Sequence, residues 1–83
     1  MRTIYVLVIE RFNEIDGTEY KVRLFERFQN AQTAMYEVFG EYLKTCKNDE
    51  YETTKDKKYC SVFGKNHTSR GISLSIEESQ TED

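Results

Sequence analysis

The chain has 83 residues, close to the lower limit for a single domain that folds without disulfides or metals. Charged residues make up 33% of it, but the formal net charge is only −3. This mixed balance argues against a dedicated binder of duplex nucleic acid, which is normally basic. No apolar run approaches the roughly 18 residues of a membrane span, none fits a signal peptide, and two cysteines cannot build a disulfide framework. We therefore expect a cytoplasmic protein that does not enter a membrane.

Residues 3–12 form the first apolar segment, which predicts a strand that is apolar on both of its sides. Alternate side chains of a strand point to opposite faces of the sheet. The two sets are Ile4, Val6 and Val8 on one side and Tyr5, Leu7 and Ile9 on the other. Because the remaining sequence predicts one helix, and one helix covers one face, the second face must stay exposed, meet another chain or hold a ligand.

A hairpin turn is predicted at Asp16 and Gly17, because both residues tolerate the left-handed backbone of tight turns. The return strand, residues 18–27, alternates apolar with charged side chains and is therefore predicted to be half buried. Its apolar set is Tyr20, Val22 and Leu24, and its charged set is Glu19, Lys21 and Arg23. These charges would also guard an exposed edge against unwanted pairing.

Residues 31–47 predict the helix, with Asn30 as its N-terminal cap. Its apolar side chains recur at helical spacing and form one stripe that would pack on the sheet. The stripe contains Ala31, Ala34, Met35, Val38, Phe39, Tyr42, Leu43 and Cys46. Lys44 and Lys47 would lie in the last turn, where positive charge suits the helix dipole. Gly40 would lie on the solvent side of the helix.

A second hairpin is predicted after a polar loop at residues 48–56. Its strands would cover residues 57–63 and 72–76, and the segment 64–71 would form the turn between them. The last strand alternates isoleucine or leucine with serine, which is typical of a strand with one buried side.

These elements predict one α+β domain over residues 1–76, followed by an acidic flexible tail at residues 77–83. The architecture is two-layer ββαββ, with a four-stranded antiparallel sheet and one helix on one face. We expect the strand order 2-1-3-4, which places the doubly apolar first strand at the centre. The order 2-1-4-3 also places the first strand at the centre and remains an alternative. The sequence also leaves open which side of the third strand faces the helix.

Few groups suitable for catalysis are present. Cys60 and His67, the only histidine, could form a nucleophile pair across the second hairpin, but no third group is placed to orient the histidine. Two cysteines and one histidine do not complete a tetrahedral zinc site, and four scattered glycines form no phosphate-binding loop. We predict that the protein is not an enzyme and holds no metal or cofactor.

If Cys60 and Val62 face the helix, the open side of the sheet gathers aromatic and aliphatic side chains edged by basic ones. The last strand has no charge or proline to guard an edge, so a partner could pair with it. The predicted partner-binding residues are Tyr5, Leu7, Ile9, Phe25, Tyr59, Phe63, Ile72 and Leu74. We expect a small regulator or inhibitor, of the kind that phages and mobile elements carry. Its partner would be another protein or a second copy in a homodimer.

Aromatic side chains flanked by Lys and Arg on an open sheet are also typical of platforms for single-stranded nucleic acid. Residues 55–71 carry five basic side chains and one acidic one, a local net charge of +4. The residues of this alternative are Lys57, Lys58, Tyr59, Phe63, Lys65 and Arg70. The segment lacks the glycine of the RNA-recognition consensus, and the acidic helix and tail would repel phosphates, so we prefer a protein partner.

Overall fold

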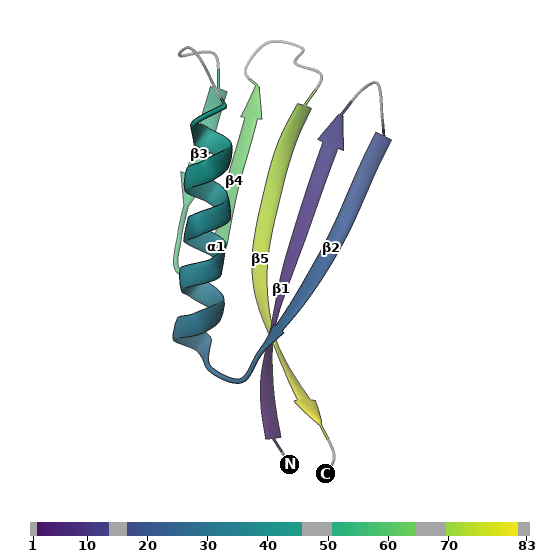
Figure 1. Ribbon diagram of the computed structural model, residues 1–83, viewed down its shortest axis with the longest axis vertical. Helices are drawn as coiled ribbons and strands as arrows, with labels where there is room; N and C mark the ends of the chain where they lie inside the picture. Colours follow the sequence, from purple (N-terminus) through teal and green to yellow (C-terminus); the bar gives the residue numbers. More distant parts are fainter. Residues whose placement is uncertain (1, 14–16, 46–50, 65–69, 82–83) are drawn as a thin grey trace.

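The computed structural model describes residues 2–13, 17–45, 51–64 and 70–81. Within these residues, five strands form one antiparallel sheet in the order β2-β1-β5-β4-β3, and one helix packs on it (Figure 1). The elements are β1 (Arg2–Asn13), β2 (Gly17–Phe25), α1 (Phe28–Leu43), β3 (Tyr51–Lys55), β4 (Tyr59–Gly64) and β5 (Arg70–Thr81). The α+β class with one helix and an antiparallel sheet is confirmed, but the sheet has five strands, not four.

The last strand lies at the centre of the sheet, between β1 and β4. The preferred order of the four expected strands was therefore wrong, and the alternative 2-1-4-3 was right. β1 and β5 both have 12 residues and pair over their whole length, from Arg2 opposite Thr81 to Asn13 opposite Arg70. The long pairing extends β5 past Ile76, so the tail expected at residues 77–83 is strand as far as Thr81.

β3 is the strand that the sequence analysis missed, since Tyr51–Lys55 falls inside the expected loop. It is short, polar and almost fully exposed, so no apolar alternation marks it. A tight turn joins it to β4, where the Asp56 amide donates to the Tyr59 carbonyl at 2.7 Å. The Asp56 carboxylate accepts the Lys57 amide at the same distance. The Tyr and Thr residues of β3 favour strands, and they are the feature of the sequence from which this strand could have been predicted.

The first hairpin agrees with the sequence prediction in its position. Gly17 has a φ of 84° and lies opposite Asn13, at the end of the β1–β2 pairing. Glycine adopts this left-handed backbone at no steric cost, which favours a turn at this point in the chain. The return strand ends at Phe25, two residues earlier than expected.

The helix begins at Phe28, because the preceding Arg27 has an extended backbone with φ −127° and ψ 137°. The expected cap at Asn30 was wrong, since that residue lies in the first helical turn and no side chain caps the helix. The helix ends at Leu43, with the Lys44 amide donating to the Gly40 carbonyl at 3.2 Å. The expected extension to residue 47, with Lys44 in the last turn, was wrong, because Lys44 and Thr45 form a turn after the helix; Cys46 and Lys47 lie outside the described residues.

The hydrophobic core lies between the helix and the three central strands. It consists of Leu7, Ile9, Ala31, Ala34, Met35, Phe39, Cys60, Val62, Ile72, Leu74 and Ile76. Within the described part of the chain, no helix is long and apolar enough to cross a lipid bilayer.

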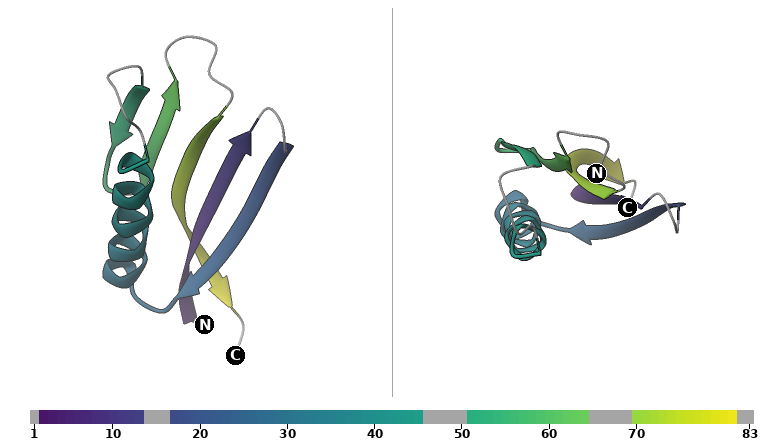
Figure 2. Two further views of the ribbon diagram at one scale, coloured as in Figure 1. Left: turned by 45° about the horizontal axis from the view of Figure 1, so that its top comes forward. Right: turned by 90° about the horizontal axis from the view of Figure 1, so that it is seen from above.

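The sheet is strongly curled. Figure 1 shows the helix along the β3–β4 side of the sheet, with β2 at the opposite edge. The end-on view in Figure 2 shows that β2 bends round to the level of the helix. The helix covers the side of the sheet that carries the core, and on the opposite side the large apolar side chains of β2 are exposed.

Candidate binding surface on the sheet

The side of β1 that carries Leu7 and Ile9 faces the helix and not the open face. Leu7 is 0% and Ile9 is 3% exposed, and Ile72 and Leu74 on β5 are 0% exposed. The expectation that these four residues line the open face or a free edge was therefore wrong. The reason is the register: Leu7 lies opposite Ile76 and Ile9 opposite Leu74, so the bulkiest side chains of both strands meet under the helix.

Tyr5 and Phe25 were also expected on the open face, and the structure places them on the helix side. They lie opposite each other in the β1–β2 pairing, so their side chains point to the same face. The Tyr5 ring packs edge-on against the ring of Phe28, with centroids 5.7 Å apart. The Arg23 guanidinium lies 5.1 Å from the centroid of Phe25. Both aromatic rings thus close the end of the core where the helix begins.

The opposite side of β1 and β2 carries an apolar patch, which we define by Ile4, Val6, Val8, Tyr20, Val22 and Leu24. Val6 lies opposite Leu24, and Val8 lies opposite Val22, so the patch is continuous across the two strands. Tyr20, Val22 and Leu24 are 65%, 56% and 65% exposed. The alternation in β2 correctly predicted that they share a side, but the prediction that this side is half buried was wrong.

Tyr59 and Phe63 are the two predicted partner-binding residues that do lie on the open face, because Cys60 and Val62 between them point into the core. Phe63 stacks on Phe12 of β1, with ring centroids 5.6 Å apart and an interplanar angle of 22°. The two rings meet across β5 at Gly71, which lies opposite both residues. The open face therefore has aliphatic and tyrosine side chains over β1 and β2 and an aromatic pair at one end.

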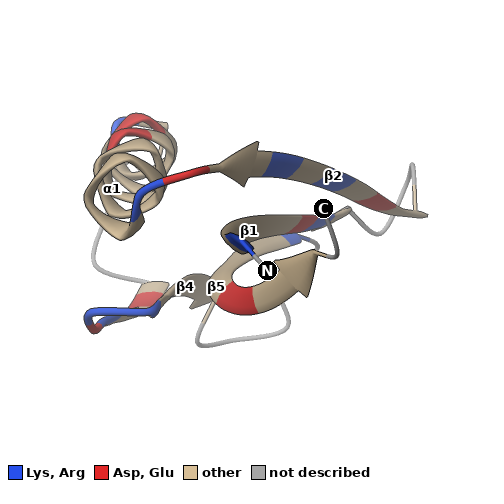
Figure 3. Cartoon of the chain, turned by 90° about the horizontal axis from the view of Figure 1, so that it is seen from below, with Lys and Arg blue, Asp and Glu red and all other residues tan. Residues whose placement is uncertain are grey.

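Acidic side chains border the apolar patch on the open face, whereas β2 carries charges of both signs on the helix side. On the open face, Glu10 lies opposite Tyr20, and Glu77 lies opposite Val6, so acidic groups border the apolar patch. Lys21 and Arg23 pair with Ile9 and Leu7, which places them on the helix side. Figure 3 shows that β2 carries both basic and acidic residues. The expected basic edge of the open face was wrong, because β1 and β2 face the opposite way.

The residues of the nucleic-acid alternative are separated by the fold. Lys57 and Lys58 lie in the turn before β4, while Tyr59 and Phe63 lie on the open face. Arg70 lies on the helix side, and Lys65 falls outside the described residues. Among the described residues, the arrangement does not gather Lys57, Lys58 and Arg70 around the half-buried rings of Tyr59 and Phe63.

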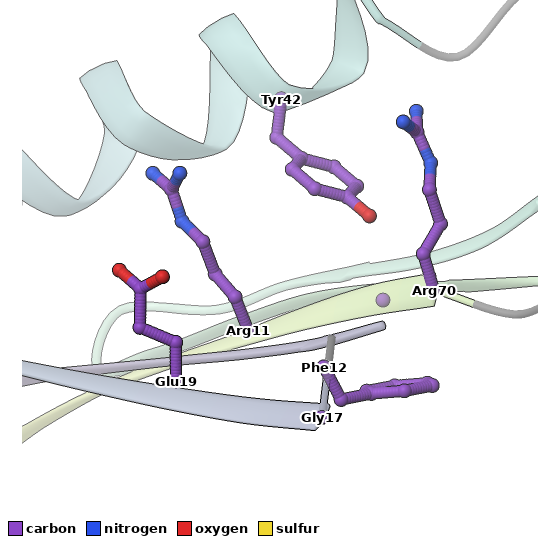
Figure 4. Close-up of a pocket in the computed structure, with 7 residues that line it drawn as sticks. Arg11, Phe12, Gly17, Glu19, Tyr42 and Arg70 are labelled. Atoms are coloured by element: carbon purple, nitrogen blue, oxygen red, sulfur yellow. The ribbon is translucent and has the colours of Figure 1, made fainter. Parts of the chain in front are cut away.

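A polar hollow of about 220 Å³ lies on the helix side, between the end of the helix and the first hairpin. Arg11, Glu19, Tyr42 and Arg70 line it, and Figure 4 shows both arginines extending toward the helix while Phe12 points away. One Nη atom of Arg70 donates to the Thr45 carbonyl at 3.1 Å and to its hydroxyl at 2.7 Å.

The Arg70 guanidinium also lies against two aromatic rings of the helix side. It is 5.2 Å from the ring centroid of Tyr42 and 6.0 Å from that of Tyr51. Both distances are within the range of a cation–π interaction. Together with the bonds to Thr45, these contacts join the start of β5 to the end of the helix, so the arginine has a structural role here.

Cys60 is free and fully buried, and burial raises the pKa of its thiol above the ordinary value. A backbone hydrogen bond at Asp56 and the charge of Lys55 oppose this rise. At neutral pH the thiol therefore stays protonated, which is the unreactive form. His67, the other member of the conceivable nucleophile pair, lies outside the described residues. Among the described residues, no three His, Cys, Asp or Glu side chains gather as a possible metal site.

Comparison of the chain with models of known protein families, with curated proteins and with solved structures returned no match.

Proposed function

We propose that the protein is a small non-enzymatic module that binds another polypeptide on the apolar patch of the open face. The observation that supports this function is the exposure of Tyr20, Val22 and Leu24, three large apolar side chains on one side of β2. They continue without interruption into the apolar side of β1. A contiguous apolar surface of this kind on a small protein commonly marks an interaction site.

Burial of the exposed apolar side chains of β2 contributes free energy to binding, but this contribution alone is too small for a stable complex. Full burial of a large apolar side chain contributes about 1.5–3 kcal/mol, so covering the exposed parts of Tyr20, Val22 and Leu24 contributes roughly 3–6 kcal/mol. Association costs about 4–15 kcal/mol in lost freedom of motion. The partner must therefore add contacts with β1, or backbone hydrogen bonds with the free edge of β2, to form a stable complex.

The acidic border indicates the chemistry of the partner. Glu10 and Glu77 lie beside the patch, so a partner with apolar side chains next to Lys or Arg would be complementary. A small acidic protein with such a surface suits a regulator or inhibitor that covers a functional site on its partner. The separation of basic and aromatic side chains gives no comparable support to a nucleic-acid platform.

Paired affinity captures followed by a binding measurement test this function. The bait is the wild-type chain or the double variant Val22→Thr/Leu24→Thr, which keeps strand-forming residues but removes most of the exposed apolar surface. We expect the wild type to retain a protein that the variant loses, and the purified pair to bind at least 10-fold more weakly with the variant. Equal binding by both baits would contradict the proposal.

A matched control changes the other side of the same strand. Lys21→Thr leaves the apolar patch intact, so we expect this variant to retain the same protein as the wild type. Because all three positions are exposed, each variant should unfold thermally close to the wild type. A loss of capture by the control would show that charge on the helix side, not the apolar patch, carries the binding.

A further inference from the structure

The outer edge of β2 is open and long. Among the described residues, β2 lies at the end of the sheet and pairs only with β1 (Figure 1). Gly17–Phe25 is exposed at every position except its last. The strand has nine residues and no proline, whereas β3 at the other edge has five residues. An unpaired strand edge presents a row of backbone donors and acceptors that another strand can bind.

The charge pattern of β2 is complementary to itself in an antiparallel arrangement. Glu19 stands two residues before Lys21, and Arg23 stands two residues after it. All three side chains point to the helix side, because they lie opposite helix-side positions of β1. When two copies of the strand run antiparallel about Lys21, Glu19 of each copy lies opposite Arg23 of the other. Opposite charges placed across two strands stabilise the pair.

We propose that two copies of the chain pair through their β2 edges in this register. The inference goes beyond the proposed function, because this pairing uses the backbone edge of β2 and leaves the apolar patch of each copy uncovered. In the dimer, the sheets join into one, and Tyr20 of each copy lies opposite Val22 of the other on the open face. The two apolar patches thereby become one continuous surface.

Only this register keeps all nine residues of β2 opposite a residue of the second β2. An arrangement about Tyr20 pairs Glu19 with Lys21 but places Leu24 and Phe25 beyond the partner strand. An arrangement about Val22 sets Lys21 against Arg23, and like charges across a pair are destabilising. The proposed register also places Lys21 of one copy opposite Lys21 of the other. A single strand pair buries less than the standard interface of about 1,200–2,000 Å², so the dimer is weak, with a dissociation constant on the order of micromolar.

Charge-reversal variants test the register by sedimentation equilibrium at low ionic strength. Glu19→Arg and Arg23→Glu each place like charges opposite each other twice, so each variant alone should dissociate at least 10-fold more readily than the wild type. An equimolar mixture of the two variants restores both opposite-charge pairs, and we expect it to form a heterodimer of wild-type affinity. The double variant E19R/R23E should dimerise as well. Recovery on mixing cannot come from a misfolded chain, which keeps the test decisive.

The inference is overturned if the wild type remains monomeric at 100-fold above the expected dissociation constant (roughly 0.1 mM). It is also overturned if the single variants dimerise as the wild type does, or if the mixture stays monomeric. Weakening by E19R but not by R23E would equally refute it, because that result belongs to the register about Tyr20. The dimer and the proposed function can fail separately. The charge variants leave the apolar patch intact, so capture of another protein by monomeric E19R supports the function alone.

Discussion

Gly71 lies between two aromatic rings of the open face that leave no room for a side chain. A Cβ atom added there would lie 2.5 Å from Cε1 of Phe12 and 2.6 Å from Cδ1 of Phe63, closer than real Cβ atoms approach other atoms. The two stacked rings cross β5 at this point because glycine leaves them room. We expect Gly71→Ala to separate the rings and lower the free energy of unfolding by about 1–3 kcal/mol. Chemical denaturation followed by far-UV circular dichroism measures this change.

Gly40 provides the matched control for that substitution. It lies within the helix, and a Cβ added there would meet no atom within 4 Å. Since alanine is a better helix former, Gly40→Ala should raise the free energy of unfolding by up to about 1 kcal/mol. Equal effects at the two glycines would show that the stacked rings adapt freely. The open space at Gly40 also shows that the fold itself does not require a glycine there.

The direction of single side chains was the hardest feature to predict from the sequence. In β1 both sides are apolar, so alternation alone did not distinguish Leu7 and Ile9 from Val6 and Val8. The structure resolves this through pairing, because β5 has only one apolar side and its register brings Leu74 and Ile76 against Ile9 and Leu7. The reliable signal was therefore in the last strand, where alternation is unambiguous.

At the scale of the elements, the helix is held along its length by different contacts. In its first half, the Gln32 amide donates to the Lys57 carbonyl at 3.0 Å, and near its middle the Tyr36 hydroxyl donates to the Asp56 carbonyl at 3.3 Å. Near its end, Arg70 bonds to Thr45. The helix is thus attached to the turn before β4 and to the first residue of β5, which orients it along the β3–β4 side.

We expect Arg70→Ala to lower the free energy of unfolding by about 1–2 kcal/mol, since it removes the bonds to Thr45 and the stacking on Tyr42. Hydrogen exchange should accelerate at the amides of residues 42–45. Arg11→Ala is the control: this arginine lines the same hollow but is exposed, so the change should stay within about 0.5 kcal/mol. Equal effects of both substitutions would mean that the hollow is stabilised by charge in general.

The helix and most strands could be predicted from the sequence, but which strands lie next to each other in the sheet could not. The hairpin at Gly17, the apolar stripe of the helix and the strand around Ile72 all carry local patterns that gave the correct element type. The order of strands depends on which pairs bury most apolar surface over their full length, and no local pattern reports this. β3 carries no such pattern either, since an exposed edge strand needs no apolar side.

At the scale of the whole molecule, the fold depends on a pairing between the two ends of the chain. β1 and β5 pair over all 12 residues, although Arg2 and Thr81 are separated by almost the entire sequence. Contacts that are distant in sequence carry a large entropic cost of closure and slow the folding of β-rich domains. Every other part of the sheet attaches to this central pair, with β2 on one side and β4 and β3 on the other.

Truncation after Ile76 tests whether the end of the chain is part of this structure. The acidic composition of residues 77–83 predicted a tail, and removal of a tail would leave stability unchanged. The structure instead pairs residues 77–81 with residues 2–6 of β1. Because a backbone hydrogen bond contributes roughly 0.5–1.5 kcal/mol net, we expect truncation to lower the free energy of unfolding by at least about 2 kcal/mol. The full-length variant Glu77→Thr/Glu78→Thr separates strand from charge: it keeps the backbone pairing, so its stability should stay close to the wild type. A truncated chain as stable as the untruncated one would show that the β1–β5 pairing past Ile76 contributes nothing, so that only the residue pairs from Leu7–Ile76 to Asn13–Arg70 stabilise the fold.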